Sequence, residues 1–140
     1  MTMPLISDYK AAVANAKVRF ATLNVLPELD SRRHPVFMAG NFACVFKVRE
    51  AGGVFLAVKC FTRDMPDLER RYRALARYIK TARSPYMVDI DYLPRELYTS
   101  SAVALSDDYP VLLMPWLQGS TIGGAVETLC QRDKRGALAA

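Results

Sequence analysis

The sequence predicts an α+β domain: an antiparallel sheet of about five strands, one helix packed on the sheet, and a helical extension before it. Two patterns carry this prediction. Residues 42–48 and 54–61 have the apolar character of strands, and Gly52 and Gly53 between them favour a tight turn. Residues 66–81 carry apolar side chains at steps of four, three and four residues, as an amphipathic helix does. This stripe consists of Leu68, Tyr72, Leu75 and Ile79.

Length and composition bound the class of protein. The chain of 140 residues predicts one domain, and its 51% of hydrophobic residues is ample for a core. The net charge of +5 fits an anionic ligand. The sequence lacks the basic cluster with interleaved aromatic residues that is typical of nucleic-acid binding. There is no signal-peptide pattern, no apolar run of membrane length and no metal-ligand spacing among the three cysteines. We therefore expect a cytoplasmic protein with no metal site.

The first 35 residues are predicted to form an N-terminal extension. Ser7 and Asp8 can cap a short helix over residues 8–16. Residues 18–29 are mixed, and Pro27 argues against one continuous element there. Residues 30–35 are charged and end in proline, which is typical of a linker.

Residues 36–118 are predicted to form the main lobe. A short strand over 36–38 leads into the strands at 42–48 and 54–61, and the helix at 66–81 follows. Residues 87–93 and 102–105 are further strand candidates, residues 106–109 form a turn, and the last strand covers 110–117. Residues 119–140 read as the start of a second, truncated helical lobe, which favours a fragment of a longer protein.

Lys59 is the residue that most clearly suggests chemistry. It stands in Phe55-Leu56-Ala57-Val58-Lys59-Cys60-Phe61, on an apolar run that reads as a buried strand. Burying an ammonium group is costly unless an anion meets it. The alternative is a lysine whose stem packs in the core while its head reaches water.

Three segments together resemble the small lobe of a protein kinase, in particular bacterial kinase-like proteins of the Ser/Thr type. The segment 38–45 aligns with G-x-G-x-x-G-x-V so that Gly40, Ala43 and Val45 occupy the second glycine, the third glycine and the valine. Residues 56–59, Leu-Ala-Val-Lys, resemble the V-A-I-K strand. Residues 109–119 resemble the strand and hinge that follow.

The resemblance implies an ATP site. Val45 and Ala57 would form the roof over adenine, although both could equally be core residues, and Lys59 would reach the α- and β-phosphates. Met114 would be the gatekeeper at the back of the pocket. The backbone carbonyl of Pro115 and the backbone N–H of Leu117 would bind the purine edge, and proline still has the carbonyl needed at its position.

The helix at 66–81 would correspond to the regulatory helix, whose glutamate orients the lysine in kinases. Glu69 is the only glutamate in it, so the resemblance assigns this catalytic role to Glu69 together with Lys59. A solvated Glu69 that pairs with Arg73 four residues on is the alternative.

The catalytic loop H-R-D-x-x-x-x-N and the D-F-G motif are absent from these residues. The resemblance therefore implies an ATP-binding small lobe whose full-length parent transfers phosphate to a protein, with magnesium bound only in that parent. A non-catalytic module that senses nucleotide or serves as a protein-interaction scaffold is the second hypothesis. We also expect an exposed apolar nucleotide face, through which a homodimer could form.

Overall fold

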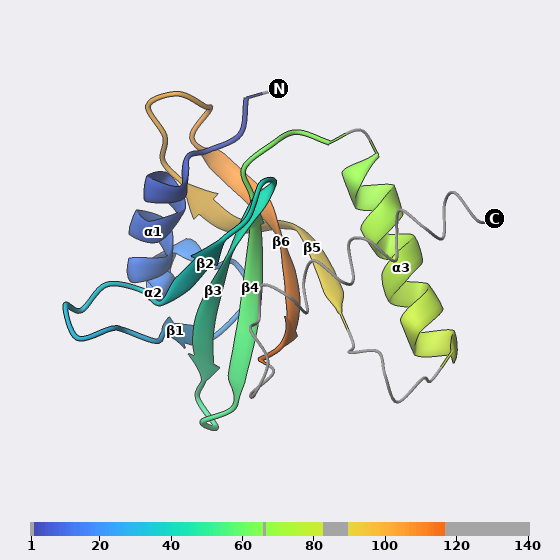
Figure 1. Ribbon diagram of the computed structural model, residues 1–140, viewed down its shortest axis with the longest axis horizontal. Coiled ribbons are helices and arrows are strands. Elements are labelled where there is room, and N and C mark those ends of the chain that lie inside the picture. The colour runs from blue at the N-terminus through green and yellow to red at the C-terminus, as the bar shows by residue number, and fades with distance from the viewer. Residues whose placement is uncertain (1, 66, 83–89, 117–140) are drawn as a thin grey trace.

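The computed structural model describes residues 2–65, 67–82 and 90–116, and these form an α+β domain (Figure 1). Its helices are α1 (Ile6–Ala14), α2 (Ala16–Arg19) and α3 (Leu68–Ala82). Its strands are β1 (Val25–Pro27), β2 (Phe37–Ala39), β3 (Ala43–Glu50), β4 (Phe55–Phe61), β5 (Asp91–Thr99) and β6 (Asp107–Pro115). The described helices include none long and apolar enough to cross a bilayer.

All strands in the described part of the chain belong to one antiparallel, six-stranded sheet. The order is β1-β3-β4-β6-β5, and β2 pairs with β3 next to β1. The β3–β4 hairpin was predicted from the alternation and from its glycines, and Gly53 at its turn has a positive φ of 88°. Strand β1 was not predicted. Its Pro27 is compatible with a strand because β1 lies at the edge of the sheet.

The last two strands differ from the sequence prediction. Residues 102–105 lie in the loop between β5 and β6 and form no strand, and the expected turn at 106–109 is largely the start of β6. Strand β5 instead runs through the polar stretch around Arg95, with an irregularity between Leu93 and Leu97 that lets the strand continue. Residues 87–89 and Leu117 lie outside the described residues.

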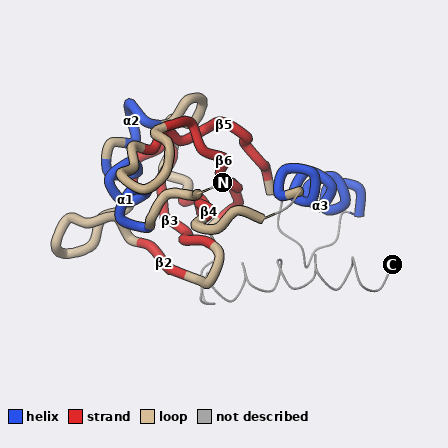
Figure 2. The backbone as a smooth tube through the Cα atoms, turned by 90° about the horizontal axis from the view of Figure 1, so that it is seen from above, coloured by secondary structure: helices blue, strands red, loops and turns tan. Residues whose placement is uncertain are grey.

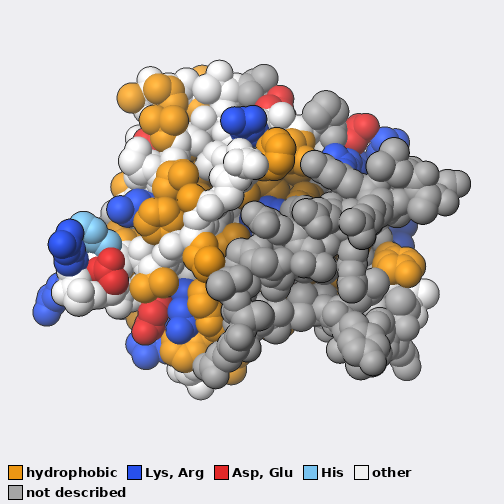
Figure 3. Space-filling view, in the orientation of Figure 1, with side chains coloured by type: hydrophobic (Ala, Val, Ile, Leu, Met, Phe, Trp, Pro, Cys, Tyr) orange, Lys and Arg blue, Asp and Glu red, His pale blue; other side chains and the backbone are white. Residues whose placement is uncertain are grey.

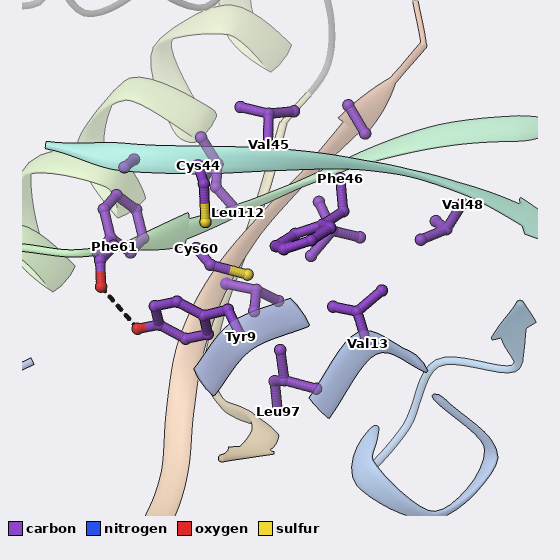
Figure 4. Packing of buried hydrophobic residues seen from close by; sticks show 14 of the residues in the cluster. Tyr9, Val13, Cys44, Val45, Phe46, Val48, Cys60, Phe61, Leu97 and Leu112 are labelled. Carbon is purple, nitrogen blue, oxygen red and sulfur yellow. Dashed lines mark hydrogen bonds between the residues drawn. The ribbon is translucent and has the colours of Figure 1, made fainter. Parts of the chain in front are cut away.

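Helices cover opposite sides of the sheet (Figure 2). On one side Tyr9 and Val13 of α1 point toward Phe46, Val48 and Leu97 (Figure 4). On the other side the predicted stripe of α3 contacts the sheet: Tyr72 and Ile79 are buried, and Leu68 and Leu75 pack against the core. Helix α1 begins at Ile6, two residues before the predicted start, and Asp8 accepts a hydrogen bond from the Leu5 N–H in its first turn.

The first 35 residues share the core of the lobe. The Tyr9 hydroxyl donates a 2.6 Å hydrogen bond to the Phe61 backbone carbonyl, and burial raises the pKa of Tyr9 far above its ordinary value. The buried carboxylate of Glu96 accepts hydrogen bonds from the backbone N–H groups of Thr22 and Leu23 at 2.7 and 3.0 Å. These contacts tie both the first helix and the segment after α2 to the sheet.

Two cysteines face each other inside the sheet. Cys44 on β3 is directly opposite Cys60 on β4, and both thiols are buried and free. Burial is the main cause that raises the pKa of Cys60 well above its ordinary value, and the hydrogen bond with Cys44 is the second. Cys60 is therefore a protonated core residue and not a reactive thiolate.

Candidate functional site

Strand register brings four of the expected nucleotide-binding residues onto one face of the sheet. Val45 is directly opposite Lys59, and Ala57 is directly opposite Met114. Residues opposite each other in an antiparallel pair share a face, and so do residues two apart on one strand. Val45, Ala57, Lys59 and Met114 therefore form one contiguous set, which we call the lysine patch. It lies on the face that α3 covers in part.

The lysine patch is buried. The exposed fractions are 4% for Val45, 0% for Ala57, 4% for Lys59 and 2% for Met114. These four side chains are therefore not part of an exposed apolar surface, and the expected homodimer stays a prediction.

Gly40 and Ala43, the other two residues of the glycine-rich resemblance, lie in the turn after β2 and at the start of β3. The Gly40 N–H donates a 2.8 Å hydrogen bond to the Ala43 carbonyl, which closes the turn. A Cβ atom on Gly40 would lie 3.7 Å from that carbonyl, an ordinary contact, so the turn itself does not require glycine there. Phe42 at the tip is partly exposed and lies under the Arg63 guanidinium, 5.6 Å from its ring centroid.

Lys59 points toward α3. Its Nζ donates a 2.9 Å hydrogen bond to the Tyr72 hydroxyl. The same nitrogen lies 5.3 Å from the Tyr72 ring centroid and 5.6 Å from that of Phe61. The lysine head is therefore held between β4 and α3 by an aromatic environment, not directed to bulk water as the alternative of a solvated head would require.

Glu69 pairs with Arg73 at the surface of α3. Its carboxylate accepts a 2.9 Å hydrogen bond from Nε of Arg73, four residues on, and its side chain is 56% exposed. This is the surface pair that the sequence also allowed. The structure thus brings Lys59 to α3, but joins it to Tyr72 and not to Glu69.

An aromatic cluster, which the sequence analysis did not identify as part of the site, fixes Tyr72. Its ring stacks on Tyr92 of β5 with an interplanar angle of 1° and a centroid distance of 6.2 Å. The Phe61 ring centroid lies 5.4 Å from that of Tyr72 and 6.5 Å from that of Tyr92. Burial, and then the nearby Glu69 charge, raise the pKa of Tyr92 to about 12, so its hydroxyl stays protonated at neutral pH. The only sequence signal was the position of Tyr72 on the apolar stripe.

The hinge end of the patch is only partly described. Pro115 is exposed and lies opposite Leu56, and Leu117 is outside the described residues. Trp116 donates its backbone N–H to the Phe55 carbonyl at 3.3 Å. Lys47, which lies on the same face as Val45, places its Nζ 4.3 Å from the Phe55 ring centroid and 5.0 Å from that of Trp116.

Two further features of the described surface were compared with the lysine patch. A hollow of about 570 Å³ lies along α3, but residues of both charges line it. Basic side chains are scattered on the face shown in Figure 3 and not gathered into a patch. The described residues include no cluster of metal-ligating side chains.

Compared with known proteins, the chain matches no family model, no curated protein and no solved structure.

Proposed function

We propose that this chain is an ATP-binding module built like the small lobe of a protein kinase. The observation that carries the proposal is the shared face of Val45, Ala57, Lys59 and Met114, which follows from the strand register. A purine roof and a phosphate-binding lysine must lie on one face if a single nucleotide is to contact both.

The order of the elements supports the same proposal. Counted from β2, Lys59 stands on the third strand, and α3 follows directly. Kinases carry their phosphate-binding lysine on the third strand and orient it from the next helix. Here α3 contacts Lys59 through Tyr72.

ATP binding by the chain is the first test. Because the patch is shielded, we expect a dissociation constant of about 1 mM, or roughly 4 kcal/mol of binding free energy. NMR titration with ATP, with and without magnesium, should shift amide signals of β3, β4 and β6. Adenosine should shift the roof positions Val45 and Ala57. No shift with either ligand at several millimolar would contradict the proposal, and micromolar affinity would mean that the pocket lies elsewhere.

Phosphoryl transfer to a Ser or Thr hydroxyl is our proposal for a longer, cytoplasmic parent protein. That parent would supply the catalytic base and the magnesium ligands. A non-catalytic nucleotide sensor or scaffold is the second candidate, and it is favoured by the pairing of Glu69 with Arg73. A kinase assay on the longer protein separates the two candidates, because only the first incorporates phosphate.

A further inference from the structure

The geometry points to Tyr72 as a residue that positions the ammonium group of Lys59. The inference rests on the proposed ATP site and deepens it. The Tyr72 hydroxyl accepts the Lys59 hydrogen bond at 2.9 Å, whereas the carboxylate of Glu69 is committed to Arg73 at the surface.

The helix geometry explains why Tyr72 has this place. Tyr72 follows Glu69 by three residues, which is a rotation of about 300° on a helix with 3.6 residues per turn. The rotation turns Tyr72 onto the apolar stripe that faces the sheet, while Glu69 stays at the border. Tyr72 is buried accordingly, and Glu69 is exposed.

Tyr72 is also held rigidly enough to position another side chain. Its ring is stacked on Tyr92 and packed on Phe61, so the hydroxyl cannot move without moving the ring cluster. Lys59 has a flexible stem with several rotatable bonds, and a fixed hydrogen-bond acceptor at its end limits the positions of the ammonium.

A hydroxyl positions a lysine differently from a carboxylate. It accepts a hydrogen bond but contributes no negative charge of its own. The Tyr72 contact therefore orients the ammonium and brings no charge to it. Loss of the Tyr72 hydroxyl should weaken binding of a ligand that contacts the ammonium through phosphates and should spare binding of an uncharged nucleoside.

Tyr72→Phe in the full chain tests this inference, because it removes the hydroxyl and keeps the stacked ring. We expect the ATP affinity to fall about two- to tenfold, the range that one hydrogen bond accounts for, while the adenosine affinity stays unchanged. Tyr78→Phe is the matched control on the same helix, because it removes the same hydroxyl from an exposed ring, and it should change neither affinity. Both affinities are measured by NMR titration, beside a thermal unfolding curve for each variant.

The outcomes separate this inference from the proposed function. If the unsubstituted chain binds ATP and Tyr72→Phe binds it equally well, Tyr72 does not position Lys59, and the proposed function stands. If Tyr72→Phe lowers ATP and adenosine affinity alike, Tyr72 is merely structural, and the inference is again overturned. If the unsubstituted chain binds neither ligand, the proposed function fails and the inference fails with it.

Discussion

Tyr9→Ala is expected to destabilise the fold by about 3–5 kcal/mol, the usual cost of removing a large buried aromatic side chain. Tyr9 is fully buried, packs edge-on against Tyr109 and donates its hydroxyl hydrogen to the Phe61 carbonyl. The substitution leaves a cavity beneath α1 and an unsatisfied carbonyl on the strand that carries Lys59. Since domains are commonly stable by only about 5–15 kcal/mol, this loss should be plain in urea denaturation.

Tyr78→Ala is the control for this prediction. Tyr78 is on α3, and 58% of its surface is exposed, so its replacement should change the stability by no more than about 0.5 kcal/mol. Equal, small effects of the two substitutions would mean that α1 is not docked on the sheet in solution.

Lys59→Met is expected to lower the affinity for ATP by about ten- to a hundredfold. Hydrogen bonds to charged groups are worth about 1.5–3 kcal/mol, and the variant removes the ammonium that would contact the phosphates. Methionine keeps most of the stem volume in the core. It does remove the donor to Tyr72, so we expect a loss of stability of about 1 kcal/mol and not unfolding. In a longer parent with a catalytic lobe, Lys59→Met should abolish phosphoryl transfer, whereas Glu69→Gln should lower its rate less.

Lys10→Met is the matched control for Lys59→Met. Lys10 lies on α1 with its Nζ 5.2 Å from the Phe37 ring centroid, on the side of the sheet opposite the lysine patch. The Lys10→Met substitution removes the same charge as Lys59→Met and should leave ATP binding nearly unchanged. If both variants lose affinity for ATP equally, ATP binding depends only on the net charge of the chain. If Lys59→Met unfolds the chain, the lysine is structural and the scaffold hypothesis becomes the better one.

Local patterns predicted the centre of the fold well. The β3–β4 hairpin and the inward face of α3 follow from alternation, turn glycines and helical spacing, and the structure confirms both. The same register arguments explain why Val45, Ala57 and Lys59 share a face. These features depend on residues close together in sequence, or on two strands joined by a short turn, so they are readable without the tertiary structure.

Features that depend on distant contacts were not predictable. Glu96 lies in a polar stretch whose sequence did not predict a strand, yet its side chain is buried. The backbone N–H of Thr22, 74 residues away, donates a hydrogen bond to its carboxylate and so makes this burial possible. Helical spacing placed Tyr72 on the stripe that faces the sheet, but its hydrogen bond with Lys59 depends on its packing against Phe61 and Tyr92. The burial of the lysine patch has the same origin in tertiary packing.

Affinity labelling with an acyl phosphate of ATP tests the central claim most directly. When such a probe is bound, a neighbouring lysine amine attacks the acyl carbon, ATP departs, and the lysine keeps the acyl group as a stable amide. We predict that mass spectrometry will find the label mainly on Lys59, although it is far less exposed than Lys80, and that excess ATP will suppress it. Labelling that follows solvent exposure and does not respond to ATP would contradict the claim that Lys59 contacts the phosphates of a bound nucleotide.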